Sequence, residues 1–450
     1  MSDRWSRTQV LALAPDAASQ RSAEGTANPR WWSEVGCYAA EGVGAVWGAC
    51  KGSGAKPYRS CVDLSGPAYR CTCPSRKFPC KHALALLLLW SEGGVPVAAA
   101  LPAWVAEWVE QRREHADRSA ARRAAPGQGA EPADPEAARR RAAQREGRVA
   151  AGLDDLDRWL RDQVRHGLAE AERAGYRHWE TTAARLVDAQ APGPAGVVRR
   201  LAAVPRSGEG WPARLLEEYA LLRLLVVAAR RLPDLPEPLR RTVRSRVGFT
   251  VGRDEVLAGP AVRDRWDVLG QHDFEEDHIK VRRVWLRGRQ SARTALVLSF
   301  AATAGQSLDA SLVTGTTVDA ELNFYPGASA LRALVARRHG TVEAYVPPGG
   351  TVATLLADYA AALADDPWLD TWPAVLSGAG LARTGAPPSA GGWLLVDPDG
   401  DAVPLHPGAG QPWRLAALSG GGRVTVAGEW TPHGLLPLTV WDAHGRVAVL

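Results

Sequence analysis

The chain has 450 residues, of which 46% are hydrophobic and 23% charged, and its net charge at pH 7 is +5. This length exceeds one ordinary core, and the composition excludes disordered and fibrous proteins. No secretion signal is visible, and no apolar run approaches the ~20 residues that a bilayer requires. Six cysteines in a chain of this size do not form a disulfide framework. We therefore expect a soluble, cytoplasmic protein of several folding units, with reduced thiols.

A small strand, strand, helix unit is predicted in the N-terminal region. Two extended runs flank the turn Ser65-Gly66-Pro67, which is typical of a β-hairpin. The apolar run that follows has no polar face, which indicates a buried helix. The region spans residues 1–112 and the unit about 51–90, with strands 58–64 and 68–73, a helix 83–90, and an earlier helix 10–23.

Composition changes divide the rest of the chain. Few hydrophobic residues and no aromatic ones between residues 119 and 147 indicate a linker or a frayed helix. Long helical patterns then predict a central helical bundle, and β-rich runs follow to the end. The fold class expected is α+β multidomain, with a small ββα finger, the central helical bundle and a β-rich C-terminal region. The predicted segments are a linker at 113–150, a helical region at 151–250, an α+β region at 262–380 and a small β-rich region at 390–450. Within the α+β region we expect strands 278–286, 294–301 and 310–325 and helices 328–338 and 351–364.

Four metal-ligand side chains, Cys71, Cys73, Cys80 and His82, lie close together in the sequence. Three thiolates and one imidazole form a structural zinc set, with Zn–S about 2.3 Å and Zn–N about 2.0 to 2.1 Å. Cys71 and Cys73 point to the same face of a strand, and Pro74 ends that strand. The loop then returns Cys80 and His82 to the start of the apolar helix. We predict one zinc ion, and the full ligand set, which leaves no position for water or substrate, makes it structural.

The pattern Cys-x-Cys, a short loop and Cys-x-His resembles the SWIM zinc finger family, in particular its bacterial stand-alone members. The wider sequence, including Leu13-Ala14-Pro15-Asp16 and residues 285–325, shares this resemblance. The family occurs in chromatin-remodelling helicases, transposases and stand-alone bacterial proteins, and is thought to bind DNA or protein. Some bacterial members accompany AAA-type ATPases and von Willebrand factor A-domain proteins. The resemblance therefore implies a zinc ion and either a nucleic-acid or a protein partner.

Basic residues gather around these ligands. The chain has five lysines among its 54 basic residues, and four of them lie between positions 51 and 81. From Lys51 to His82, seven basic residues accompany a single acid, Asp63. Basic side chains on a rigid loop suit contacts with phosphate, and aromatic side chains suit stacking on bases. We predict nucleic-acid contacts, to DNA first, at Arg70, Arg76, Lys77 and Lys81, with Trp31, Trp32, Trp47, Tyr58 and Phe78 as candidates for stacking.

Two other roles for the finger stay open. The basic loop also suits an acidic protein surface, which would make the protein an adaptor, or the zinc serves the fold alone. An enzyme is not expected, because the chain has no Gly-x-Ser-x-Gly elbow and no His-Glu-x-x-His motif. Gly52-Ser53-Gly54-Ala55-Lys56 lacks the spacing of a phosphate-binding loop. No small-molecule substrate is evident.

Further metal ligands and thiols have weaker patterns. His272-Asp-Phe-Glu-Glu-Asp-His278 is a candidate for a second metal, although an acidic loop in water before a strand is the commoner structure. Cys61 would face Cys71 across the hairpin if the turn is tight. Cys37 and Cys50 have no matching histidine and are expected to be buried thiols.

Overall fold

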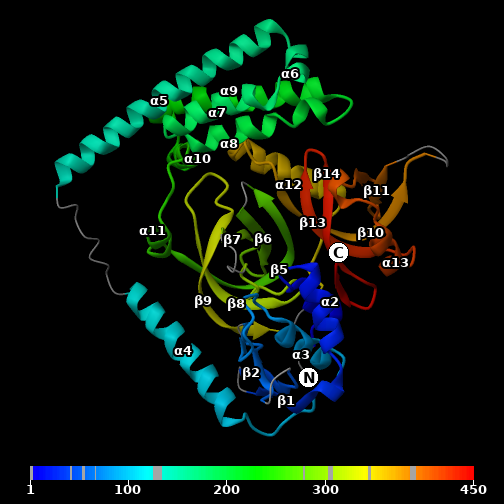
Figure 1. Ribbon diagram of the computed structural model, residues 1–450. Coiled ribbons are helices and arrows are strands. Elements are labelled where there is room, and N and C mark those ends of the chain that lie inside the picture. The colour runs from blue at the N-terminus through cyan, green and yellow to red at the C-terminus, as the bar shows by residue number, and fades with distance from the viewer. Residues whose placement is uncertain are drawn as a thin grey trace.

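The structure is a computed structural model that shows three sheets and a helical bundle. In Figure 1 a five-stranded barrel lies at the centre, the N-terminal sheet below it, a six-stranded sheet beside it and the bundle above. The predicted α+β multidomain class is confirmed. No helix in the described part of the chain is long and apolar enough to cross a bilayer. The described residues are 4–40, 43–52, 56–65, 67–124, 134–276, 279–302, 308–342, 346–385 and 392–450.

The predicted hairpin is one edge of a four-stranded antiparallel sheet, ordered β1-β2-β3-β4. Sequence patterns did not predict β1 and β2, because glycines interrupt the second of them. At Gly48 a Cβ would lie 2.9 Å from the side chains of Trp32 and Val35. The glycine therefore makes room for the tryptophan ring. The elements of this region are α1 (Arg7–Ala12), α2 (Ala17–Thr26), η1 (Pro29–Trp31), β1 (Trp32–Ala40), β2 (Val43–Cys50), β3 (Tyr58–Asp63), β4 (Ala68–Cys71) and α3 (Lys81–Ser91).

Helix α3 lies at the centre of the N-terminal core. Every residue from His82 to Trp90 is buried. The helix contacts β2 and β3 as well as α1 and α2, and its core includes Ala310 and Val313 from the connection between two barrel strands. Apolar neighbours on all sides explain why the helix has no polar face. The zinc-binding unit therefore shares its core with the rest of the protein.

Two long helices occupy most of the segment that composition marks as a linker, residues 113–150. These are α4 (Ala103–Ala124) and α5 (Pro135–His166), and residues 125–133 between them lie outside the described residues. The start of α4 packs Val105 and Val109 against the N-terminal sheet. Alanine and arginine are strong helix formers, so a segment with few hydrophobic residues forms a solvated helix.

The helical region forms one core, built around Trp179, Tyr219 and the leucines of α5 and α9. Helices α8 and α10 approach closely at Gly193, where a Cβ would lie 1.8 Å from the carbonyl oxygen of Arg246. A side chain at this position would force the two helices apart. The elements are α6 (Ala169–Arg173), α7 (Tyr176–Asp188), α8 (Pro192–Leu201), η2 (Val204–Arg206), α9 (Trp211–Arg230), η3 (Leu232–Asp234), α10 (Glu237–Val247) and the following α11 (Arg253–Leu257).

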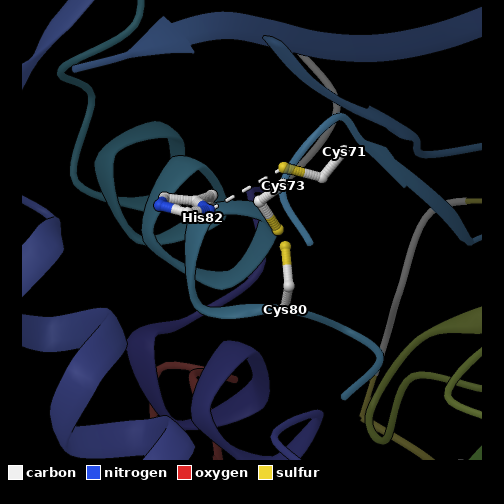
Figure 2. Close-up of side chains that lie close together, drawn as sticks. All are labelled: Cys71, Cys73, Cys80 and His82. Carbon is white, nitrogen blue, oxygen red and sulfur yellow. Dashed lines mark hydrogen bonds between the residues drawn. The ribbon is translucent and has the colours of Figure 1, made fainter. Parts of the chain in front are cut away.

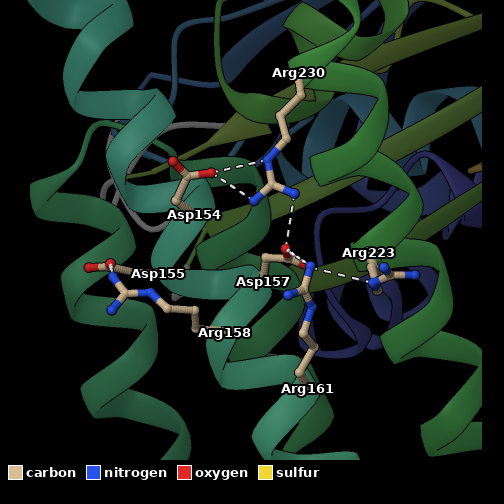
Figure 3. Close-up of polar contacts among 7 residues, drawn as sticks. All are labelled: Asp154, Asp155, Asp157, Arg158, Arg161, Arg223 and Arg230. Carbon is tan, nitrogen blue, oxygen red and sulfur yellow. Dashed lines mark hydrogen bonds and ion pairs between the residues drawn. The ribbon is translucent and has the colours of Figure 1, made fainter.

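A buried carboxylate joins α5 to α9 in this bundle. The Asp157 side chain is 3% exposed and accepts hydrogen bonds from Arg161 at 2.7 Å and Arg230 at 2.9 Å. Arg223 lies 3.4 Å away, and Arg230 also donates to Asp154. Figure 3 shows these arginines converging on Asp157. Because the arginines are about half exposed, each keeps contact with water while it offsets the buried charge.

We predict that Asp157→Asn lowers the free energy of unfolding by about 2 kcal/mol, because the hydrogen bonds lose their anionic acceptor. Urea unfolding followed by circular dichroism at 222 nm measures the change. Asp155→Asn is the control, since Asp155 pairs on the surface with Arg158 and should cost at most about 0.5 kcal/mol. Equal effects of the two substitutions would contradict the assigned role of the buried carboxylate.

The central barrel closes in the order β5-β6-β7-β9-β8, and its interior holds a cluster of apolar side chains. All neighbouring strands are antiparallel except β7 and β9, which are parallel. The helix predicted at residues 328–338 is wrong, because most of this segment is strand β9. Its alanines and arginines favour a helix, but pairing with β7 and β8 closes the barrel and overrides that preference. The strands are β5 (Ala261–Glu276), β6 (Ile279–Gly288), β7 (Thr294–Ala301), β8 (Thr317–Phe324) and β9 (Arg332–Val342).

The C-terminal sheet has six strands in the order β12-β11-β10-β13-β14-β15. It packs Ala427 and Leu438 against Trp285 on the outside of the barrel. Its last strand lies beside α1, where Val449 donates a hydrogen bond to Thr8 at 3.3 Å. The elements are α12 (Val352–Asp365), β10 (Trp372–Arg383), β11 (Trp393–Val396), β12 (Ala402–Pro404), η4 (Pro407–Ala409), α13 (Trp413–Ser419), β13 (Val424–Thr431), β14 (Gly434–Trp441) and β15 (Val447–Val449).

Candidate metal centre and adjoining groove

Three short segments bring the predicted ligands together. Cys71 ends β4, Cys73 lies in the following turn, Cys80 precedes α3 as its N-cap, and His82 lies in the first turn of that helix. Figure 2 shows the side chains facing a common point. Their ligand atoms all lie within 4.8 Å of one another. The four residues are therefore positioned to hold one metal ion.

The distances suit zinc. The Sγ of Cys71 lies 3.8 Å from the Nδ1 of His82, and tetrahedral zinc sets such a pair about 3.6 Å apart. The backbone of Thr72 donates to Arg59 at 3.0 Å, which holds the chain just after Cys71 against β3. The ring of Tyr58 packs on His82 with centroids 5.0 Å apart. These neighbours fix the orientation of two ligands.

The thiols are close enough to form hydrogen bonds with one another. A hydrogen bond with Cys80, together with burial, raises the pKa of Cys71, and the same bond lowers the pKa of Cys80 to about 4. Burial raises the pKa of Cys73. A thiolate at Cys80 thus accepts a hydrogen bond from the thiol of Cys71. A divalent cation would replace such protons and neutralise the sulfurs, which is the chemistry of a structural zinc ion.

Two family models match the chain: the SWIM zinc finger matches residues 61–90, and the SWIM-associated four-helix bundle domain matches residues 144–247. The chain therefore contains a SWIM zinc finger. The first match covers the four ligands, and the second covers most of the bundle from α5 to α10. The family resemblance and the single zinc ion predicted from the sequence are confirmed. No curated protein and no solved structure matches the chain.

The predicted cations of the SWIM finger lie on different sides of it. Arg70, Arg76, Lys77 and Lys81 are all exposed. The Nζ of Lys77 lies 2.7 Å from Asp16 at the start of α2, and this contact lowers the pKa of Asp16 to about 2. Arg70 pairs in register with Cys61, and strand alternation points its side chain away from the face of Cys71. Lys81 lies in the first turn of α3, beside the zinc ligands.

A groove of about 710 Å³ runs between α2 and the SWIM finger. Three of the five lysines of the chain line it, Lys51, Lys77 and Lys81, together with Trp31 and Tyr58. No acidic side chain is among its described lining residues. The role of α2 as the opposite wall could not be predicted from the sequence, because that helix contributes only small side chains. They are Ala18, Ser19, Ser22, Gly25 and Thr26.

The aromatic candidates divide into surface and core. Trp31 is 47% exposed and Phe78 40% exposed, so both reach the surface. Trp32 and Trp47 are buried in the N-terminal cores, and the expectation that they stack on bases is therefore wrong. Tyr58 is partly buried on the groove floor. Burial of tryptophan at a strand face is the ordinary packing of a large apolar ring.

Two weaker expectations are also corrected. Cys71 pairs with Ser60, not Cys61, which is buried on the opposite face with a raised pKa. The segment from His272 to Glu276 belongs to strand β5 instead of a solvated loop, and residues 277–278 lie outside the described residues. His272 contacts Glu429, Asp273 contacts Arg282, and Glu276 contacts Arg200.

Proposed function

We propose that the SWIM finger binds nucleic acid in the groove between α2 and the zinc site, with DNA as the expected form. The observation that carries this proposal is the groove lining, which combines three lysines with two aromatic rings and no described acid. In this proposal the zinc fixes the loop that carries Lys77 against the start of the helix that carries Lys81. The protein acts in the cytoplasm by binding, without catalysis.

The chemistry of the groove supports a single strand. Lysine ammonium groups neutralise phosphates and release counterions, while Trp31 and Tyr58 offer faces on which unpaired bases stack. Lys51 and Lys81 are exposed, whereas Lys77 would first exchange its contact with Asp16 for a phosphate. The main phosphate contacts proposed are therefore Lys51 and Lys81.

We predict that Lys51→Gln with Lys81→Gln weakens binding of a fluorescein-labelled oligothymidine and makes its salt dependence shallower. If both lysines contact phosphates of a single strand, the slope of log affinity against log salt falls by about 1.4, or roughly 0.7 per phosphate. Fluorescence anisotropy across a salt series measures both quantities. Zinc content, determined by elemental analysis, should stay at one ion per chain.

Arg70→Gln is the matched control for this experiment. It also removes one exposed positive charge beside a zinc ligand, but on the face away from the groove. Its slope should stay close to that of the unchanged protein. If Arg70→Gln weakened binding as much as Lys51→Gln or Lys81→Gln alone, the loss of affinity would come from the change in net charge and not from the groove. Unchanged binding by the double variant would refute the groove proposal.

A protein adaptor is the second candidate. Helix α7 exposes Tyr176 by 65% and Val187 by 44%, and these residues lie eleven positions apart on one face of the helix. Large exposed apolar side chains often mark protein contacts. The family resemblance makes AAA-type ATPases and von Willebrand A-domain proteins the partners to test. Val187→Glu should weaken such a complex and leave oligothymidine binding unchanged.

A further inference from the structure

The connectivity of the central barrel has a precedent among nucleic-acid-binding folds. Its first strand, β5, pairs with the second and the fourth, and its third, β7, pairs with the second and, in parallel, with the fifth. This is the strand order of the oligonucleotide- and oligosaccharide-binding barrel, whose ligands lie across strands two and three. Topology alone does not assign a ligand. A ligand can be assigned only from the side chains on the corresponding face.

Aromatic and cationic side chains line the outer face of the first three strands. Phe274 pairs in register with Val281, which pairs with Phe300. The two phenylalanines therefore flank one valine in a row that crosses three strands, about 10 Å apart. Phe300 is 50% exposed. In the next row, Arg283 lies over the ring of Phe274, 4.6 Å from its centroid.

The remaining half of this face is covered. Trp285 and Leu296 form the third row, and both pack against the C-terminal sheet. That sheet therefore leaves open the end of the face that carries Phe274 and Phe300. The bundle lies beyond this end, because Arg200 at the end of α8 pairs with Glu276 at 3.0 Å. The aromatic row thus lies between two covered regions.

The charges on this face do not oppose a polyanion. Asp273 and Glu275 alternate with Phe274 and so point to the other side of the strand. Glu276 shares the outward face, but Arg200 neutralises it. Glu429 is 2% exposed and contacts both His272 and Arg283. The face therefore presents two phenyl rings and a guanidinium group, and the acidic residues around them are paired with basic ones.

We propose that the outer face of β5, β6 and β7 is a second nucleic-acid site, which holds unpaired bases on Phe300 and on the stacked pair of Phe274 and Arg283. This rests on the proposed function of the groove, whose lysines contact phosphates, and adds the barrel as a second surface on which bases stack. A sheet face with aromatic rings and a planar guanidinium group stacks unpaired bases and excludes a duplex, whose bases are already stacked. The substrate class is therefore single-stranded nucleic acid.

The test uses the full chain with zinc bound and fluorescein-labelled oligothymidine of about 30 nucleotides, long enough to span several binding elements. Phe300→Ala should weaken binding about tenfold, because stacking on one ring is lost. Phe300→Tyr keeps a ring and should bind like the unchanged protein. Leu356→Ala is the control, since Leu356 is 42% exposed on α12 but lies off the barrel.

The salt slope separates this site from the groove. Phe300→Ala should lower the affinity at every salt concentration without changing the slope, because no phosphate contact is removed. A loss with Phe300→Ala but not with the lysine variants would support the barrel site and refute the groove. Unchanged affinity of Phe300→Ala, an equal loss in Phe300→Tyr, or no binding by the unchanged protein would overturn the barrel proposal.

Discussion

Removal of the zinc ion with a chelator is expected to weaken oligothymidine binding about tenfold and to leave most of the helices folded. Residues 72–80 form no helix or strand, so the metal is the main link that holds this loop between β4 and α3. Without it Lys77 and the wall formed by Cys73 and Pro74 lose their positions, and a preorganised site becomes a flexible one. Helix α3 keeps its apolar core.

Elemental analysis, far-ultraviolet circular dichroism and anisotropy together check this expectation. Isolated zinc fingers depend on the metal for about 10–16 kcal/mol of binding free energy that is also folding energy. Here the shared core supplies part of that stability, so only the loop should open. Cys73→Ser should behave like the chelated protein. Cys61→Ala, which removes a buried thiol that is not a ligand, should retain zinc and binding.

Two results would contradict this view. Loss of helical signal throughout the chain would mean that α3 depends on the metal for its fold. Undiminished binding after complete loss of zinc would place the nucleic-acid site elsewhere. Limited proteolysis distinguishes a local opening, because cleavage should be confined to residues 72–80.

Glu429→Ala should lower the free energy of unfolding by about 3 kcal/mol. This carboxylate is 2% exposed where the C-terminal sheet meets the barrel, and it accepts hydrogen bonds from Trp285 at 2.7 Å and His272 at 3.2 Å. Arg283 lies 3.9 Å away. Removing one partner of a buried pair costs about 3–5 kcal/mol, and the lower value applies because His272 and Arg283 still reach water.

The loss of stability in Glu429→Ala should depend on pH. Burial alone would raise the pKa of Glu429, but the hydrogen bonds from His272 and Trp285 and the charge of Arg283 outweigh it and hold the pKa below its usual value. A carboxyl group with a lowered pKa stabilises the fold above its unfolded pKa, and this contribution disappears as the pH falls through the folded value. The difference between Glu429→Ala and the unchanged protein should therefore be full at pH 7 and shrink below about pH 4.5.

Urea unfolding at several pH values measures this difference. Glu92→Ala is the control, because Glu92 pairs with Arg7 at the surface and should cost at most about 1 kcal/mol. A cost for Glu429→Ala that does not change between pH 7 and pH 3 would show that packing, not charge, is lost.

The metal site could be predicted from the sequence because its geometry is local. Four ligands lie between positions 71 and 82, and the alternation of a strand followed by the first turn of a helix brings them together. The groove could not be predicted in the same way. Its second wall is α2, more than forty residues earlier, and its small side chains carry no chemical signal.

The strands, too, could be predicted only where the local sequence by itself favours the extended form. Strand β7 was predicted with its observed bounds, since its apolar and β-branched residues favour a strand by themselves. Strand β9 was mistaken for a helix because only β7 and β8, paired at a distance, select the extended form. The barrel order and its outer face follow from pairings of this kind. They became visible only with the tertiary structure.

The contact between Thr8 and Val449 has a consequence for synthesis of the protein on the ribosome. Helix α1 is synthesised well before its neighbour β15, because the two residues in contact lie 441 positions apart in the chain. Gln9 of the same helix donates to the backbone of Thr314, also far along the chain. The zinc-binding unit can therefore collapse early in translation around the part of its core that residues 5–95 supply, but α1 reaches its final packing only when β15 has left the exit tunnel.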